Sequence, residues 1–228
     1  MIKNISNLGD AALYCDFGKD VNKDTNTQVI KYFKSIKKEN IDGINNLTPS
    51  YNKLIISFDL KKTNYKEVKR LIENLNVEDH NSLKKKKIQI PVCIDHSFSL
   101  DIKRLEQILK LNCDKIYENF FNKEFFCYMT GFIAGMPFLG DLDINMRAKR
   151  LETPRVRVPK GSIGLTEQFT NIYTFESPGG WNIIGNTPLN IFDSSNEKDP
   201  NLINPGDTIV FKKITKNQYQ NYNEQKSF

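Results

Sequence analysis

Histidine is scarce in this chain of 228 residues, which holds only His80 and His96. Zinc sites and Ser-His-Asp triads both draw on histidine, so the sequence offers little material for either. Asp95, His96 and Ser97 are consecutive, so these three side chains cannot face one another as a triad. We therefore interpret His96 as a loop residue and predict no metal site.

Cysteine is also rare, and no two cysteines have Cys-x-x-Cys spacing. The four cysteines are far apart in the sequence: Cys15, Cys93, Cys113 and Cys127. This spacing is typical of buried, reduced thiols rather than of disulfides or zinc ligands, and it indicates a cytoplasmic protein. No apolar run approaches the ~20 residues of a membrane span, and residues 1–4 lack the apolar core of a signal peptide. We expect no membrane partner.

Positive charge is only moderately in excess. The net charge of +6 and the pI of about 9.0 come mainly from lysines spread along the chain. One run, Lys84 to Lys87, directly precedes an apolar alternation, so the solvated start of a strand explains it better than a nucleic-acid patch. We expect no nucleic-acid partner.

The first 90 residues alternate between strand and helix patterns. Apolar residues at helical spacing predict helices over 28–36 and 65–75. Short apolar or alternating runs predict the strands, which lie at 11–17, 43–47, 53–60 and 88–92. The order strand, helix, strand, strand, helix, strand favours a ferredoxin-like βαββαβ domain over residues 1–90.

Residues 91–228 have a different pattern of apolar and turn-forming residues. Two short helices are expected first, at 102–109 with Ser99 as a cap and at 113–121 with Asn112 as a cap. Short apolar pieces then alternate with Gly and Pro turns, and strands are expected at 125–130, 162–165, 172–175, 181–184 and 209–211. These patterns predict an α+β chain whose second domain is a β-barrel or sandwich, with a polar tail that frays from Thr215.

Three segments concentrate glycine and proline: GFIAGMPFLG from Gly131, PRVRVPKGSIG from Pro154 and SPGGWNIIGNTP from Ser177. The first is not a phosphate loop, since no Gly-Lys-Ser/Thr sequence follows it. On a strand, Arg155 and Arg157 would point to one face, where they either bind a carboxylate or phosphate or remain solvated. The third segment holds the only tryptophan, which either lines a ligand site or packs in the core of a tight hairpin.

At these segments the chain resembles the family of the B-type subunit of 5-oxoprolinase, also described as KipI-type kinase inhibitors or allophanate hydrolase subunit 1-like proteins. The family patterns GFxPGFxYLG, PRxxVPxGSVGIxGxQTGIYP and SPGGWxLIGRTP occur here in the same order and at compatible spacing. Weaker matches extend over nearly all of the chain. The resemblance implies a ferredoxin-like domain followed by a cyclophilin-like β-barrel.

The resemblance also implies a function. The family's enzymes are ATP-dependent, act only in a complex with a homologous C-type subunit and an A-type subunit, and open 5-oxo-L-proline to L-glutamate. ATP is therefore the implied cofactor, bound somewhere in that complex. One branch of the family instead binds and inhibits a sensor histidine kinase without catalysis, which is the alternative function. Membership of a biotin-dependent carboxylase-like system is a third possibility.

Residue chemistry and the resemblance together suggest catalytic roles for Arg155, Arg157 and Gln168. Substrate-binding residues are expected along the glycine-rich segments: Gly135, Phe138, Gly161, Ser162, Ser177, Gly179, Gly180 and Trp181. The chain departs from the family at Ala134, Met136 and Asn186, and at residues 167–171. There the family's Gly-x-Gln-Thr-Gly loop is replaced, and Gln168 is interpreted as its surviving glutamine. We expect these changes either to alter the substrate or to remove part of the chemistry.

Overall fold

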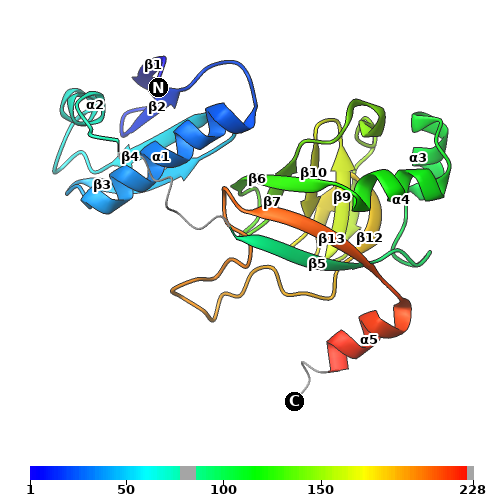
Figure 1. Ribbon diagram of the computed structural model, residues 1–228. Coiled ribbons are helices and arrows are strands. Elements are labelled where there is room, and N and C mark those ends of the chain that lie inside the picture. The colour runs from blue at the N-terminus through cyan, green and yellow to red at the C-terminus, as the bar shows by residue number, and fades with distance from the viewer. Residues whose placement is uncertain (78–85, 225–228) are drawn as a thin grey trace. The chain divides into compact units, whose positions relative to one another are not determined.

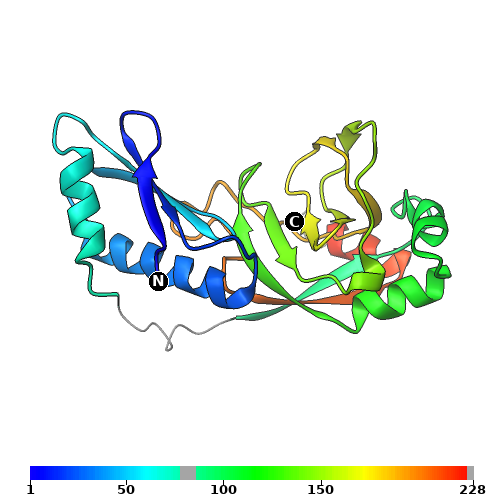
Figure 2. The ribbon, with the colours of Figure 1, turned by 90° about the horizontal axis from the view of Figure 1, so that it is seen from above.

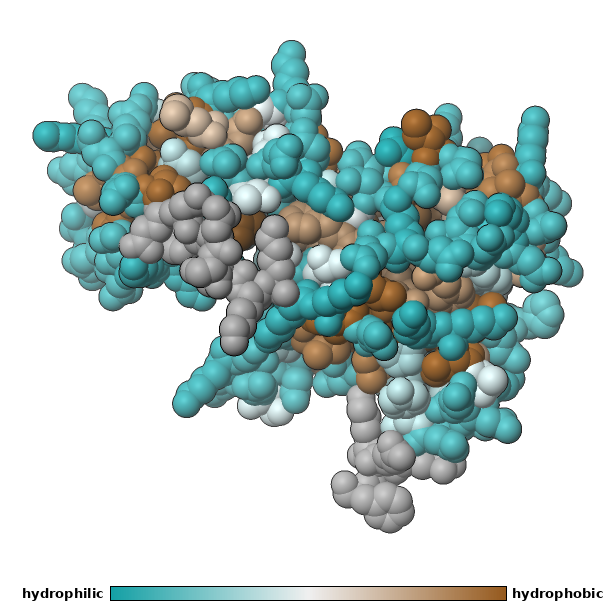
Figure 3. All heavy atoms as spheres, in the orientation of Figure 1, coloured by the Kyte–Doolittle hydropathy of each residue, from teal (hydrophilic) through white to brown (hydrophobic). Residues whose placement is uncertain are grey.

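The computed structural model describes residues 1–77 and 86–224, with side chains to residue 222 (Figure 1). The chain divides into two compact units, Met1–Lys84 and Lys85–Phe228, each with its own hydrophobic core. His80 and the first half of the predicted lysine run lie outside the described residues. Within the described ranges, no helix is both long and apolar enough to cross a membrane. The visible face of each unit is mainly hydrophilic, with brown apolar patches between the polar side chains (Figure 3).

The first unit is a four-stranded antiparallel sheet with two helices on one face (Figures 1 and 2). Alternate residues of the central strands are buried against these helices, as the period of two in a strand requires. The sheet order is β1-β2-β4-β3. In chain order the elements are β1 (Asn4–Asn7), β2 (Ala12–Asp16), α1 (Lys23–Glu39), β3 (Ile44–Pro49), β4 (Lys53–Phe58) and α2 (Tyr65–Glu73).

Asparagine side chains fix where both helices begin. The Asn22 side chain accepts a hydrogen bond from Thr25 N, and the Asn64 side chain accepts one from Glu67 N, so each satisfies a backbone N–H that the helix leaves free. Both predicted helices are present. The first begins at Lys23 rather than at residue 28, because its opening turns are polar and carry no apolar stripe.

The ferredoxin-like prediction is not confirmed for the first unit, and the placement of its last strand is wrong. β5 (Lys87–Cys93) belongs to the barrel of the second unit, where it pairs in parallel with β13 (Thr208–Ile214). The sheet edge beside β2 is held instead by β1, a polar strand that periodicity did not identify. The division between Lys84 and Lys85 therefore places all of β5 in the second unit, whereas the predicted boundary at residue 90 cut through it.

The second unit contains a closed seven-stranded barrel of order β10-β7-β6-β13-β5-β12-β9, so the barrel expected from sequence is confirmed. Its remaining strands are β6 (Glu124–Thr130), β7 (Pro137–Gly140), β9 (Ser162–Thr166), β10 (Phe169–Ile172) and β12 (Asn182–Asn186). Inward side chains such as Ile163, Ile172 and Ile184 form the barrel core. A short 3-10 helix, η1 (Ile144–Met146), lies in the loop after β7.

Two helices precede the main run of barrel strands: α3 (Ile102–Leu109) and α4 (Cys113–Phe121). The predicted cap of α4 is confirmed, because the Asn112 side chain accepts from Lys115 N. The predicted cap of α3 is wrong. Asp101 holds the cap position, whereas the Ser99 hydroxyl donates to Ile94 O and accepts from the Tyr117 hydroxyl.

The predicted fraying from Thr215 is wrong as far as Glu224, because α5 (Lys216–Glu224) forms there, and residues 225–228 lie outside the described residues. Thr215 and Gln218 make a capping box, in which each side chain accepts from the other residue's backbone N–H. The Tyr219 ring packs 4.6 Å from the Phe98 ring, and its hydroxyl donates to Asn186 Oδ1 at 2.8 Å. These contacts anchor a segment whose polar composition suggested disorder.

Candidate functional site

A two-stranded ribbon of β8 (Arg155–Val158) and β11 (Ser177–Gly179) covers part of the outer barrel wall. Ile172 and Ile184 face the barrel core, so their neighbours Tyr173 and Ile183 face outward. These outward residues form a second, smaller core with side chains of the ribbon and of the first glycine-rich segment: Met136, Val158, Tyr173 and Ile183, with Ile133 and Phe138 half-buried beside them. The three glycine-rich segments therefore meet on this wall.

Two glycines allow side chains to approach the backbone closely here. A Cβ added at Gly179 would collide with the Tyr173 hydroxyl. A Cβ added at Gly164 would lie 2.6 Å from Asn171 Oδ1 and 3.0 Å from Trp181 Cβ. Tyr173, Asn171 and Trp181 thus lie directly against backbone that no larger residue could provide.

Phe138 and Trp181 form the aromatic part of the wall. Their rings meet edge to face with centroids 5.6 Å apart, a favourable aromatic geometry. Both side chains are half-buried, so each keeps some contact with solvent. The structure therefore brings together two of the predicted substrate-binding residues.

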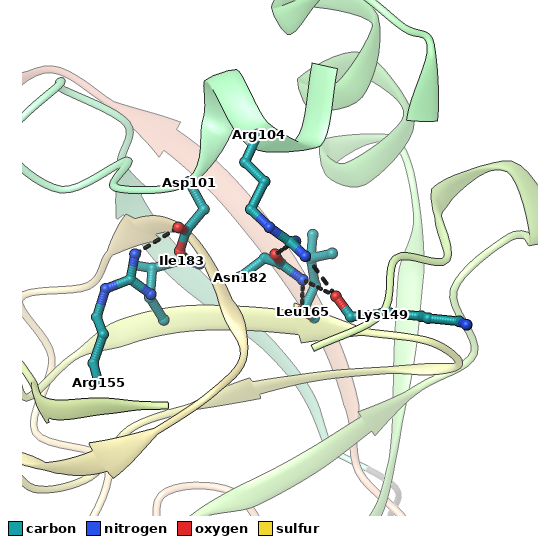
Figure 4. A network of polar contacts seen from close by, with 7 residues as sticks. All are labelled: Asp101, Arg104, Lys149, Arg155, Leu165, Asn182 and Ile183. Atoms are coloured by element: carbon teal, nitrogen blue, oxygen red, sulfur yellow. Dashed lines mark hydrogen bonds and ion pairs between the residues drawn. The ribbon is translucent and has the colours of Figure 1, made fainter. Parts of the chain in front are cut away.

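Arg155 makes a largely buried ion pair. Its Nη2 lies 2.5 Å from Asp101 Oδ1, and Asp101 Oδ2 accepts from Ile183 N at 2.7 Å (Figure 4). The Asp101 side chain is only 5% exposed, so its charge depends on Arg155 for compensation. The pair also joins the ribbon to the start of α3 and to β12.

A second polar network, which the sequence did not predict, lies beside this ion pair (Figure 4). Asn182 is fully buried and donates to Leu165 O at 3.0 Å and to Lys149 O at 3.1 Å, while Arg104 donates to its Oδ1. The network ties α3, β9 and β12 to the loop that precedes β8. Its one sequence signal is an asparagine directly before the apolar residues of β12.

The three predicted catalytic residues do not share one set of partners. Arg157 is 79% exposed and lies 3.7 Å from Glu176, whereas Arg155 is paired with Asp101. Gln168 occupies the turn between β9 and β10 and donates to Asp141 Oδ1 at 2.5 Å. These contacts provide no single anion site formed by all three.

The family pattern, aligned residue by residue, refines two of these predictions. The pattern's glutamine falls at Phe169, so Gln168 stands at a variable position, as Arg157 does. Thr170 is the residue retained in that loop, and its hydroxyl donates to Gly164 O at 2.8 Å. Only Arg155, of the three predicted catalytic residues, occupies a position that the pattern specifies.

The remaining predicted residues have mainly structural surroundings. Gly135 and Gly161 have positive φ values of 67° and 81°, and a Cβ at either would collide with neighbouring atoms. Ser162 is buried at the start of β9. Gly180 is adjacent to the flexible end of the Arg150 side chain.

Several buried polar atoms in and under the ribbon lack a hydrogen-bond partner among the residues whose side chains are described. They are Arg155 Nη1, Ser177 Oγ, and both Nδ2 and Oδ1 of Asn171. Over the same part of the chain, no three His, Cys, Asp or Glu residues are grouped so that they could hold a metal ion. The unpaired atoms are hydrogen-bonding groups that suit an organic ligand better than a cation, because they include donors.

Comparison with known proteins supports a family assignment. The model of a family described as carboxyltransferase domain, subdomain C and D, matches residues 3–203. The chain is 29% identical to the B subunit of 5-oxoprolinase from Bacillus subtilis, over 97% of both chains. It is 30% identical to the protein of the same name from Haemophilus influenzae, over 91% of this chain and 96% of that one. The crystal structure of TTHA0988 superposes with a TM-score of 0.80 at 26% identity, over 90% of this chain and 40% of that chain.

Proposed function

Because the chain belongs to the family of the carboxyltransferase domain, subdomain C and D, we propose that it is one component of an ATP-dependent 5-oxoprolinase. The observation that carries this proposal is its similarity, over nearly the whole length of both chains, to two proteins named as the B subunit of 5-oxoprolinase. The site agrees with it, since the segments that match the family patterns converge on one wall of the barrel.

The proposed role of this chain is to bind and orient the cyclic amide. Arg155 Nη1 is a charged donor left over from the Asp101 pair, and it suits the carboxylate of 5-oxoproline. The edge-to-face pair of Phe138 and Trp181 would contact the apolar face of a small ring. Ser177 and the backbone at Gly179 and Gly180 would complete the site along β11.

Arg157 and Gln168 have weaker support as catalytic residues. Arg157 is solvent-exposed, so it would act only on a group that another protein of the complex brings to the surface of the ribbon. Gln168 already donates to Asp141, which also accepts from the Tyr128 hydroxyl. We therefore assign Arg155 the leading role among the three.

ATP does not fit the residues of this wall. A triphosphate needs a backbone N–H cradle or several available cations. Here Arg155 offers only its Nη1, because Asp101 engages Nη2, and the Lys160 side chain is held by Asn190 at 2.8 Å, so several cations do not converge. ATP, which would activate the amide carbonyl by phosphorylation, is therefore proposed to bind elsewhere in the complex.

The complex is proposed to contain a homologous C-type subunit and an A-type subunit, in the cytoplasm. This chain spans only 40% of the TTHA0988 chain, so in that protein the fold is joined to further sequence. The second unit also exposes apolar side chains that suit contact with a partner: Phe132, Ile144 and Val156, at 79%, 84% and 81% exposure. The barrel is proposed to be the cyclophilin-like domain that the resemblance implies.

The test is 5-oxoproline-dependent ATP hydrolysis, with glutamate measured as product, by the co-expressed subunits with and without this chain. We expect both activities to require this chain. A stable complex that forms no glutamate from 5-oxoproline would contradict the proposal, and binding to histidine-kinase dimerisation domains would then be measured for the inhibitor alternative.

A further inference from the structure

Asn171 is a fully buried side chain on β10, and neither of its amide atoms makes a hydrogen bond of standard geometry within the described residues. Unpaired buried polar groups cost free energy and are rare in folded proteins. An asparagine at this position therefore calls for a partner that the folded chain does not itself provide.

Burial raises the pKa of Tyr173, whereas hydrogen bonds from the Asn171 side chain and the Trp181 backbone lower it, so the Tyr173 hydroxyl is a partial partner. A contact that lowers the pKa of a tyrosine is donated to its oxygen, so it engages one N–H of the Asn171 amide. Oδ1 and the second N–H of the amide stay unpaired. Tyr173 therefore does not replace the missing partner.

The position of Asn171 places it under the aromatic wall. In register across the sheet, Asn171 lies between Phe138 of β7 and Gly164 of β9. Its Oδ1 and Trp181 Cβ both lie over Gly164. Asn171 is buried, whereas Trp181 beside it is half-buried and keeps some contact with solvent, so a ligand of the amide would have to displace the indole.

We propose that Asn171, which replaces the final glycine of the family's Gly-x-Gln-Thr-Gly loop, is a specificity-determining residue of this chain that recognises the ring amide of a lactam through two hydrogen bonds. This inference rests on the proposed function. In a five-membered lactam the amide is cis, so its N–H and C=O point to the same side. The asparagine side chain offers a matching C=O and N–H, so Oδ1 accepts from the ring N–H and Nδ2 donates to the ring carbonyl.

The second unpaired group completes the match to a lactam that carries a carboxylate. Arg155 Nη1 is buried and unpaired, and Arg155 is close enough to Tyr173 to interact with it electrostatically. Asn171 and Arg155 are thus both neighbours of Tyr173. A lactam held by Asn171 would direct its carboxylate to Arg155. One ligand would then supply partners for both the Asn171 amide and Arg155 Nη1.

Trp181 makes the test direct, because it is the only tryptophan in the chain. Its fluorescence is titrated in the full chain with 5-oxoproline and with the matching lactone carboxylate, which has a ring oxygen in place of the N–H. We expect the lactam to bind roughly tenfold more tightly than the lactone, as one lost buried hydrogen bond implies. Equal affinities would overturn the inference, and this comparison needs no variant.

Two variants separate recognition from packing. Asn171→Leu keeps the approximate size and removes both hydrogen bonds, so the preference for the lactam is expected to disappear. Thr170→Val is the matched control, because it removes a buried hydroxyl from the adjacent residue on the opposite face of β10. The control is expected to lower the melting temperature while keeping the roughly tenfold preference.

The outcomes also distinguish this inference from the proposed function. If the co-expressed enzyme hydrolyses 5-oxoproline and Asn171→Leu leaves its KM unchanged, the inference is wrong and the proposed function stands. If the complex forms no glutamate but the lactam changes Trp181 fluorescence in an Asn171-dependent way, the recognition site is supported and the proposed enzyme activity fails. A lower affinity that Thr170→Val reproduces would show that Asn171 only supports packing, for example around a buried water.

Discussion

Replacing Arg155 by methionine removes the partner of a buried carboxylate while keeping most of the aliphatic packing. Asp101 is 5% exposed and would keep only the hydrogen bond from Ile183 N. Breaking a fully buried pair from one side costs about 3–5 kcal/mol. Because the Arg155 side chain is 28% exposed, we expect a smaller loss of about 2–4 kcal/mol in the free energy of unfolding.

Urea unfolding followed by Trp181 fluorescence measures this loss in the second unit, where the only tryptophan lies. With an m value of about 2 kcal/mol per molar urea, the midpoint is expected to fall by about 1–2 M. Arg157→Met is the matched control, because Arg157 lies on the same strand but is 79% exposed. The control is expected to change stability by less than about 0.5 kcal/mol.

A double-mutant cycle tests the cause of the effect. Asp101→Asn keeps an acceptor for Ile183 N but removes the charge. The double variant Asp101→Asn with Arg155→Met is therefore expected to recover most of the loss, since no buried charge remains unpaired. Equal effects of Arg155→Met and Arg157→Met, or additive effects in the cycle, would refute the assignment of Arg155 to a buried pair.

Three further predictions concern other parts of the second unit. In urea unfolding, Gly179→Ala is expected to lower the free energy of unfolding by about 2–4 kcal/mol, because the added Cβ would collide with Tyr173. Gly180→Ala is expected to cost less than about 1 kcal/mol, because its Cβ would meet only the flexible end of the Arg150 side chain. Tyr219→Ala removes the Phe98 contact and the bond to Asn186, so amide exchange in residues 216–222 is expected to quicken while the barrel amides stay protected, and slower exchange would contradict the docking of α5. Burial raises the pKa of Tyr117 to about 12 from its usual 10.0, so its contribution to stability is present below pH 10 and is lost as the pH rises toward 12. Tyr117→Phe is expected to flatten the fall in the free energy of unfolding across that range, and an unchanged slope would show that Tyr117 is not responsible.

Several features of the fold followed from local sequence. Asn112 was predicted to cap α4, and its side chain does so because an asparagine before an apolar stripe satisfies a free N–H of the first turn. A strand was predicted at 209–211, and β13 begins at Thr208, directly after the Pro205-Gly206-Asp207 turn. These features depend on residues a few positions apart, which a sequence displays directly.

The candidate site was predictable only in outline. The family patterns pointed to the segments that form the ribbon, and to Phe138 and Trp181, but the structure alone shows that they share one wall. Neither Asp101 nor Asn182 was singled out, because each acts across a long sequence separation on a side chain or backbone group brought near by the fold. Arg155 and Arg157 look equivalent in the sequence, but one neighbours a buried carboxylate and the other faces solvent.

Local sequence was sufficient to specify the helices of the first unit, the run of short strands in the second and the family to which the chain is similar, because periodicity and turn residues are local properties. The folded chain was needed to establish that β5 joins the barrel rather than the first sheet, that a polar tail becomes the helix α5, and that Asn171 is buried beside Trp181. Strand pairing and burial depend on which surfaces meet after the chain has folded, and the contacting residues are distant along the chain.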